Sequence, residues 1–318
     1  MRAVSSEVEL EDAPCPCGSE AGDALVFVGR DRLHGLPGEF AVVRCLACDL
    51  VRTNPRPTRE TIGFYYPSSY RLHQAPPPPA PTKPRRFARA RKLASSMIDF
   101  RTKPLPENGP GHYYEVGCGN GGFLRVMQSK GWSVEGLEPG ETGAESARAQ
   151  GLDVVCAQLE DAPAPKKTPD LVAAWMVLEH LHDPVAGLRR LHEWTRPGAY
   201  LAASVPNVES LEFSVFKGAW YALQVPTHLY FYTPKTLAAL FDSAGWTLER
   251  VFHHRNITNL VTSTGYKLED LGVAPALAQH LIGYPSRATW QLLATYPLAT
   301  VLAALGQTGR ITVWARRR

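Results

Sequence analysis

Short apolar runs alternate with amphipathic stretches from residue 111 to the end of the chain. Helical patterns fill three of the intervals, at about residues 122–130, 141–150 and 184–195. Alternating strands and helices are typical of a parallel sheet covered by helices on both faces. The pattern therefore predicts an α/β fold with a doubly wound, mainly parallel, seven-stranded sheet. The expected strands are residues 112–117, 132–139, 152–157, 170–177, 199–206, 247–254 and 310–317.

The N-terminal part of the chain follows a different pattern. Residues 40–53 predict a strand, a tight turn and a second strand, and residues 55–70 predict a short helix followed by an aromatic turn. Proline dominates residues 75–84, where it excludes helix and favours an extended linker. A basic amphipathic stretch at 85–100 predicts a further helix. We expect a small domain over 1–73, a Pro-rich linker and basic helix over 74–110, and a Rossmann-like domain over 111–318 with an insertion near 207–236.

Four of the six cysteines form two close pairs, Cys15 with Cys17 and Cys45 with Cys48. Two pairs of thiols brought together supply the four ligands of a tetrahedral zinc, and such a site is closed to substrate. The first pair is C-x-C, one residue shorter than the usual C-x-x-C, so whether it retains zinc stays open. Free thiols or disulfides are the alternative, and disulfides are disfavoured without a secretion signal. We expect a structural Zn²⁺ in a zinc-ribbon-like N-terminal domain.

The chain has 318 residues, of which 44% are apolar and 20% charged, an ordinary composition for a globular protein. Its net charge is +4, and the excess is concentrated at residues 83–103 and 316–318. Basic runs are usually solvated surface and otherwise favour anionic partners. Phe87 is the only aromatic ring between Lys83 and Arg91. Since base stacking needs more rings than this, nucleic acid is not expected as a partner.

Residues 288–305 are the most apolar stretch late in the chain, and they only just reach the length needed to cross a membrane. Gln291 and Pro297 interrupt them, so we predict a buried helix. The alternative is a surface that makes weak peripheral contact with a membrane. Residues 1–14 lack the apolar core of a secretory signal. We therefore expect a cytoplasmic location, and the oligomeric state stays open.

Residues 113–124, YYEVGCGNGGFL, place a glycine cluster between a predicted strand and a predicted helix. In open α/β sheets, ligands bind at this edge. One register, G-x-G-x-x-G from Gly117 to Gly122, suits a dinucleotide such as NAD. A second register, E-x-G-x-G-x-G from Glu115 to Gly121, suits S-adenosylmethionine (SAM). The glycines alone therefore leave the cofactor open.

Two acids bear on this choice. Glu138 ends the next predicted strand, where a carboxylate can accept hydrogen bonds from both ribose hydroxyls of either ligand. Glu115 lies inside the first strand, where it suits a ligand that carries an ammonium and a sulfonium and would repel a pyrophosphate. These positions favour SAM.

Three motifs in order carry a resemblance to a known family: EVGCGNGGFL, then VEGLEP, then DLVAAWMVLEHLHDP. Over about residues 110–255 the chain resembles the class I SAM-dependent methyltransferases, especially the small-molecule type related to ubiquinone-biosynthesis O-methyltransferases. The cysteine pairs and the segment 220–234 resemble a subset with an N-terminal zinc-binding segment. Members of that subset are similar to methyltransferases of sugar, polysaccharide and secondary-metabolite clusters.

Carried over position by position, this resemblance implies a SAM site. The glycine turn would shape the pocket for the methionine part of SAM, Glu138 would bind the ribose diol, and Pro139 would lie beside the adenine. Gln158 stands where the family usually has an acid, and its amide can still hydrogen-bond to the adenine amine. The implied cofactor-binding residues are Glu115, Gly117, Cys118, Gly119, Gly121, Glu138, Pro139, Gln158, Leu159, Trp175 and Met176.

Methyl transfer to oxygen needs alignment and a general base of near-neutral pKa, for which histidine is the natural choice. The candidate catalytic residues are His180, after the fourth strand, and His228. His228 alternates with Tyr230 and Tyr232, so we expect one face to present the three side chains to an acceptor pocket. For either histidine, a hydrogen-bonded structural role is the alternative.

Two neighbouring acids are given structural interpretations. Glu179 is expected to be a helix-start acid, and Asp183, just before Pro184, a helix cap.

The sequence as a whole favours a SAM-dependent enzyme that methylates a hydroxyl of a small molecule or of a glycan or sugar precursor. Sugar C-methylation and NAD-dependent oxidoreduction are the alternatives. A non-catalytic anion-binding module is the least favoured function.

Overall fold

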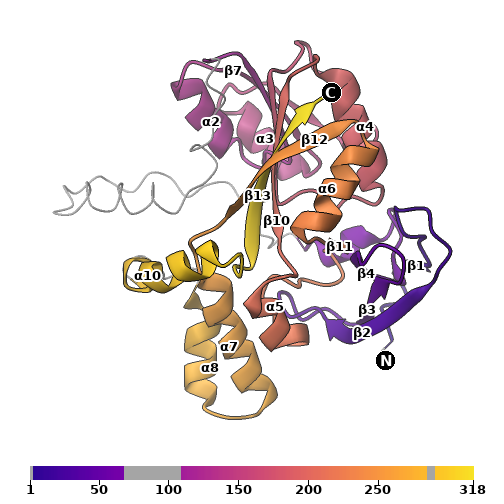
Figure 1. The fold of residues 1–318 in the computed structure, drawn as a ribbon, viewed down its shortest axis with the longest axis vertical. Coiled ribbons are helices and arrows are strands. Elements are labelled where there is room, and N and C mark those ends of the chain that lie inside the picture. The colour runs from indigo at the N-terminus through magenta and orange to yellow at the C-terminus, as the bar shows by residue number, and fades with distance from the viewer. Residues whose placement is uncertain (1–2, 68–108, 285–290) are drawn as a thin grey trace.

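The computed structural model describes residues 3–67, 109–284 and 291–318. The predicted basic helix over 85–100 and most of the 74–110 linker lie outside these residues. Figure 1 shows a central sheet flanked by helices, with the N-terminal strands gathered at one end and a group of helices projecting from the sheet.

The central sheet has seven strands in the order β12-β13-β10-β9-β6-β7-β8. Neighbours from β10 to β8 are all parallel, and β13 is antiparallel to both β10 and β12. All seven predicted strands are confirmed, as is the mainly parallel order. Their bounds are β6 His112–Val116, β7 Ser133–Glu138, β8 Val154–Cys156, β9 Leu171–Trp175, β10 Tyr200–Pro206, β12 Trp246–His253 and β13 Arg310–Arg317.

Helices cover both faces of this sheet. On one face, α2 and α3 bury Phe123, Leu124 and Ala144 in a core with Tyr113. On the other, α4 and α6 bury the aliphatic side chains that their helical spacing places on one side. The sheet is therefore doubly wound, as predicted. The bounds are α2 Gly122–Ser129, α3 Glu141–Arg148, α4 Pro184–Trp194 and α6 Pro234–Ser243.

The N-terminal segment forms a four-stranded sheet in the order β11-β4-β3-β2, and β1 pairs separately with β5. The predicted strand, turn and strand over 40–53 are confirmed, and the predicted short helix is the 3-10 helix η1 (Ile62–Tyr65). The fourth strand, β11 (Tyr230–Phe231), comes from the insertion, not from the N-terminal segment. The other bounds are β1 Leu10–Glu11, β2 Asp23–Arg30, β3 Glu39–Cys45, β4 Val51–Thr53 and β5 Arg56–Pro57.

The projecting helices are α5 (Leu211–Phe216), α7 (Thr258–Asp270), α8 (Pro275–Ile282) and α10 (Gln291–Ala304), with the short η3 (Lys217–Ala219) after α5. A helix was predicted over 288–305 and is present as α10, but the prediction that it is buried is wrong. Helix α10 buries Ala299 and Leu302 against Ile257, but Leu298 and Val301 are more than half exposed. Over residues 295–304, whose side chains are described, the helix packs along one side. Among the residues that the structure describes, no helix is long and apolar enough to cross a membrane.

Candidate active site

The turn between β6 and α2 leaves little room for a side chain at two of its glycines. Gly117, Gly119 and Gly121 have φ values of 68°, 54° and 77°, a region that favours glycine. A Cβ on Gly117 would lie 2.7 Å from Val177 Cγ2, and a Cβ on Gly121 would lie 2.2 Å from Leu152 Cδ1. The backbone at this edge of the sheet can therefore come close to a ligand, and no other residue type fits these positions without rearrangement.

Glu138 ends β7 and is fixed beside this turn. Its Oε2 accepts a hydrogen bond from the N–H of Gly119 at 2.7 Å, and its Oε1 accepts one from the N–H of Gly140 at 2.8 Å. The residue is 7% exposed. A carboxylate offers about four lone-pair sites, and two backbone amides are enough to set its direction. The carboxylate is thus pre-oriented at the edge where ligands bind in such folds.

The other residues of the implied pocket differ in exposure. Glu115 is buried within β6, and Cys118 is buried in the turn, where burial raises the pKa of its thiol. Pro139 and Gln158 are exposed. Leu159 is buried in the core on the α4 face. The side chain of Leu159 therefore serves the core.

Trp175 and Met176 lie at the end of β9, which is the direct neighbour of β6. The Nε1 of Trp175 donates to the hydroxyl of Tyr113 at 3.2 Å, and its ring meets Phe123 edge-on at a centroid distance of 5.6 Å. Met176 has a φ of 59°, which is uncommon for a residue other than glycine. Both residues are half-buried at the same edge of the sheet as the glycine turn.

The two candidate catalytic histidines meet, although they are distant in sequence. The rings of His180 and His228 are edge-on, with centroids 4.7 Å apart. His228 Nδ1 lies 2.9 Å from the carbonyl of Ala222, and His180 Nδ1 lies 2.8 Å from the carbonyl of Thr227. Because a carbonyl can only accept, each Nδ1 carries the proton and each Nε2 is left as the basic nitrogen. Burial lowers the pKa of both imidazoles, and that of His180 to about 4, so both are neutral at pH 7.

Glu179 completes this cluster and was missed as a site residue. One oxygen of Glu179 and one nitrogen each of His180 and His228 lie within 4.8 Å of one another. Glu179 is fully buried, neither of its carboxylate oxygens has a hydrogen-bond partner among the described residues, and burial raises its pKa to about 8. The interpretation of Glu179 as a helix-start acid is wrong, since α4 begins at Pro184. Asp183 is the cap, as predicted, and accepts from the N–H of Ala186 at 2.9 Å.

The two tyrosines beside His228 do not line an open face. Tyr230 and Tyr232 are buried and stacked on each other, with centroids 6.2 Å apart. The hydroxyl of Tyr232 donates to the carbonyl of Leu178 at 3.1 Å, and that of Tyr230 donates to the carbonyl of His182 at 3.1 Å. Both hydroxyls therefore tie the insertion to the segment after β9, which is a structural task.

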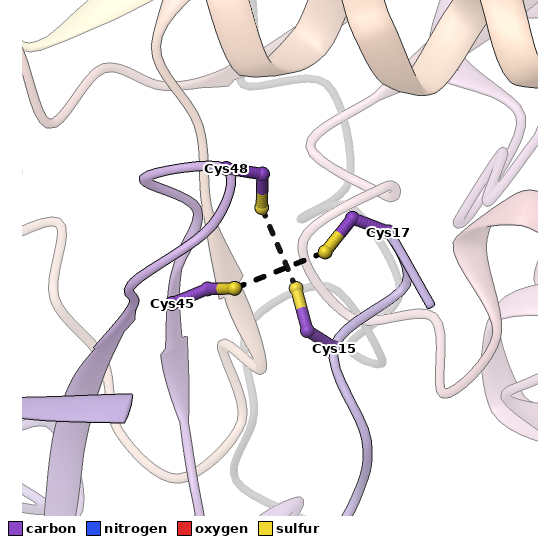
Figure 2. Close-up of side chains that lie close together, drawn as sticks. All are labelled: Cys15, Cys17, Cys45 and Cys48. Carbon is purple, nitrogen blue, oxygen red and sulfur yellow. Dashed lines mark hydrogen bonds between the residues drawn. The ribbon is translucent and has the colours of Figure 1, made fainter. Parts of the chain in front are cut away.

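The four N-terminal cysteines converge, as Figure 2 shows. The Sγ atoms of Cys15 and Cys48 are 3.6 Å apart, and those of Cys17 and Cys45 are 3.8 Å apart. All four sulfurs lie within 4.8 Å of one another. A tetrahedron of sulfurs at about 2.3 Å from a central zinc has edges of about 3.8 Å. The shortened C-x-C pair therefore still presents both of its thiols at a spacing that suits zinc.

A left-handed glycine turn, an oriented acid at the end of β7 and a polar cluster after β9 define a cofactor-dependent enzyme of the doubly wound α/β class. Residues 87–251, just over half of the chain, match the family described as "Methyltransferase domain". The chain belongs to this methyltransferase family. The resemblance to class I SAM-dependent methyltransferases is thereby confirmed.

Curated proteins similar to this chain include ubiquinone biosynthesis O-methyltransferases. The one from Pseudomonas paraeruginosa is 32% identical over 145 residues, which cover 41% of this chain and 62% of the relative. The one from Xylella fastidiosa is 30% identical over 48% of this chain and 68% of the relative. This chain thus matches less than two thirds of the length of the Pseudomonas relative and about two thirds of the Xylella relative. A solved S-adenosylmethionine-dependent methyltransferase from Mesorhizobium loti is 22% identical, with a TM-score of 0.43 over 71% of this chain and 96% of that one.

Proposed function

We propose that this protein is a SAM-dependent methyltransferase that methylates a hydroxyl group of a small molecule. The observation that carries the proposal is the Glu138 carboxylate, which two backbone amides hold beside a turn whose glycines have positive φ. The family membership and the relatives named as O-methyltransferases support the same conclusion. They do not favour NAD-dependent oxidoreduction.

The residues at this edge fit SAM by their chemistry. Glu138 would accept hydrogen bonds from the ribose hydroxyls, and the buried carboxyl of Glu115 would face the cationic methionine part. The glycine turn would line the methionine part, and Pro139 and Gln158 would lie at the adenine. Trp175 and Met176 would bound the reacting end. When bound, SAM supplies the electrophilic methyl group, and the protein supplies position and electrostatics.

On the acceptor side, we assign the proton transfer to His180 and His228. Each ring is neutral, and each Nδ1–H is held by a carbonyl, so each Nε2 has the lone pair that a general base needs. Burial lowers the pKa of both rings below the near-neutral value expected from the sequence. His228 is buried, and His180 is partly buried. A sugar or glycan precursor is the first acceptor class to screen. A C-methyltransferase on a sugar ketone would use the same basic nitrogens.

We further propose that the four cysteines bind a structural Zn²⁺. Four thiolates complete the coordination shell of zinc and leave no position for substrate. The spacing of the sulfurs supports this assignment. A cytoplasmic location, absence of nucleic acid as a partner and weak peripheral contact with a membrane stay predictions from the sequence.

Calorimetric titration with S-adenosylhomocysteine tests the cofactor assignment. Wild-type protein should bind, and Glu138→Ala should lose at least tenfold in affinity, because the ribose loses a charge-assisted acceptor. Glu145→Ala is the control, since Glu145 is exposed on α3. Absence of binding by the wild type would refute the proposal. Transfer of labelled methyl groups to a panel of nucleotide sugars, glycosides and phenols then identifies the acceptor.

A further inference from the structure

The N-terminal segment reaches both histidines of the proposed acceptor site. Thr53, the last residue of β4, donates through Oγ1 to the carbonyl of His228 at 2.8 Å. Tyr66, directly after η1, places its hydroxyl 2.8 Å from His180 Nδ1, across a sequence separation of 114 residues. The site is thus assembled from both parts of the molecule.

His180 Nδ1 is shared by two oxygens. The carbonyl of Thr227 and the hydroxyl of Tyr66 each lie 2.8 Å from it. Because the carbonyl can only accept, the Nδ1–H donates to it, and the phenol oxygen accepts from the same N–H in a three-centre hydrogen bond. This arrangement fixes the ring direction and leaves Nε2 as the basic nitrogen.

We infer that Tyr66 is a positioning residue for His180, an inference that rests on the methyltransferase function proposed above. In that reaction, Nε2 takes the proton of the acceptor hydroxyl, and the electron pair of the broken O–H bond stays on oxygen. The imidazolium that forms is disfavoured by burial. Two oxygen acceptors on Nδ1–H stabilise this cation and hold the ring in the tautomer that leaves Nε2 basic. In enzymes where a base activates a nucleophile, a third group orients the base in the same way.

The neighbouring tyrosine provides a matched comparison. Tyr65 is fully buried, and its hydroxyl donates to the carbonyl of Pro37 at 2.7 Å, within the N-terminal segment. Tyr65→Phe and Tyr66→Phe therefore each delete one hydroxyl from adjacent residues. Only Tyr66→Phe removes a contact with His180.

The test is the long-range ¹H–¹⁵N spectrum of the histidine rings in ¹⁵N-histidine-labelled full-length protein, with the His180 signals assigned through His180→Gln. In the wild type at pH 7, His180 should carry its proton on Nδ1. Tyr66→Phe should shift the His180 Nδ1 signal, and Tyr65→Phe should leave it in place. A wild-type His180 protonated on Nε2 would overturn the inference, and so would a Tyr66→Phe spectrum in which His180 is unchanged.

The wild-type measurement decides the tautomer even if Tyr66→Phe fails to fold. Titration of the same samples with S-adenosylhomocysteine separates the two proposals. Binding by the wild type together with an unchanged His180 signal in Tyr66→Phe would reject only the role of Tyr66. Absence of binding by the wild type would reject the proposed function, whatever the histidine spectra show.

Discussion

The carboxyl group of Glu179 is buried, and its oxygens have no hydrogen-bond partner within the part of the chain that the structure describes. Burial raises its pKa from 4.5 to about 8, against a smaller opposing effect of the Arg310 charge. Between these two values the folded protein keeps the proton that the unfolded chain has lost. Because the unfolded state then binds fewer protons, stability falls as pH rises through this window, by at most about 1.4 kcal/mol per pH unit.

Replacing Glu179 with Gln should remove this pH dependence, since glutamine keeps the shape and does not titrate. We expect the unfolding free energy of Glu179→Gln, relative to wild type, to rise between about pH 5 and pH 8. Urea denaturation at a series of pH values measures this difference. Glu145→Gln, an exposed position on α3, is the control. Parallel pH profiles for wild type and Glu179→Gln would contradict the prediction.

The sequence predicted the positions of some site residues and missed the surroundings of others. The glycine turn and Glu138 were placed correctly at one edge of the sheet, because the motif and the end of the next strand are local features. The environment of Glu179 was not predicted. Its backbone carbonyl accepts from Leu229 and Tyr230, and its burial comes from that later segment. No pattern within a few residues of Glu179 carries that information.

The strands of the central sheet and the helices that cover it were predicted because each has a regular spacing of apolar residues and clear terminal residues. Strand β11 was not predicted, since it has only two residues and pairs with a strand far back in the chain. The exposure of α10 was also missed. Its apolar residues lie on all sides of the helix, so the sequence alone does not show which side packs against the rest of the protein.

The turn between β3 and β4 couples the proposed zinc to the acceptor side of the site. Cys45 and Cys48 hold this turn, and β4 pairs with β11, which begins two residues after His228. Cys48→Ser should therefore lower the bound zinc well below one ion per chain. It should also speed amide hydrogen exchange in residues 229–231.

Elemental analysis and hydrogen-exchange mass spectrometry measure these two effects. Cys156→Ser, on β8, is the matched control, because Cys156 lies outside the thiol cluster. Unchanged exchange in residues 229–231 after loss of the metal would show that β11 is held without it. One zinc per chain in Cys48→Ser would show that this thiol is not a ligand.

At the scale of the whole molecule, the N-terminal segment and the main sheet share a core. Cys15, Cys45 and Leu50 belong to the same buried cluster as Leu229 and Tyr230. Since the insertion also supplies a strand to the N-terminal sheet, the predicted boundary at 73 is crossed by both hydrogen bonds and apolar contacts. We therefore expect a single cooperative unfolding transition for the chain.

Arg56 is a buried polar link across this interface. It is 8% exposed, its Nε donates to Glu11 at 2.7 Å, and its Nη1 donates to the carbonyl of His182 and the hydroxyl of Tyr230, both at 2.9 Å. Arg56→Met should cost about 3 kcal/mol, because it removes three hydrogen bonds of a buried guanidinium, at about 1 kcal/mol each.

Arg59 is the matched comparison for this loss. It pairs with Asp161 across the same interface, but the two side chains are 38% and 64% exposed. Solvent screens such a pair, so Arg59→Met should cost less than about 1 kcal/mol. Chemical denaturation of the two variants measures the difference. Equal losses would mean that burial does not set the strength of these links. Two separate transitions in Arg56→Met would mean that the two parts need this arginine to unfold as one unit.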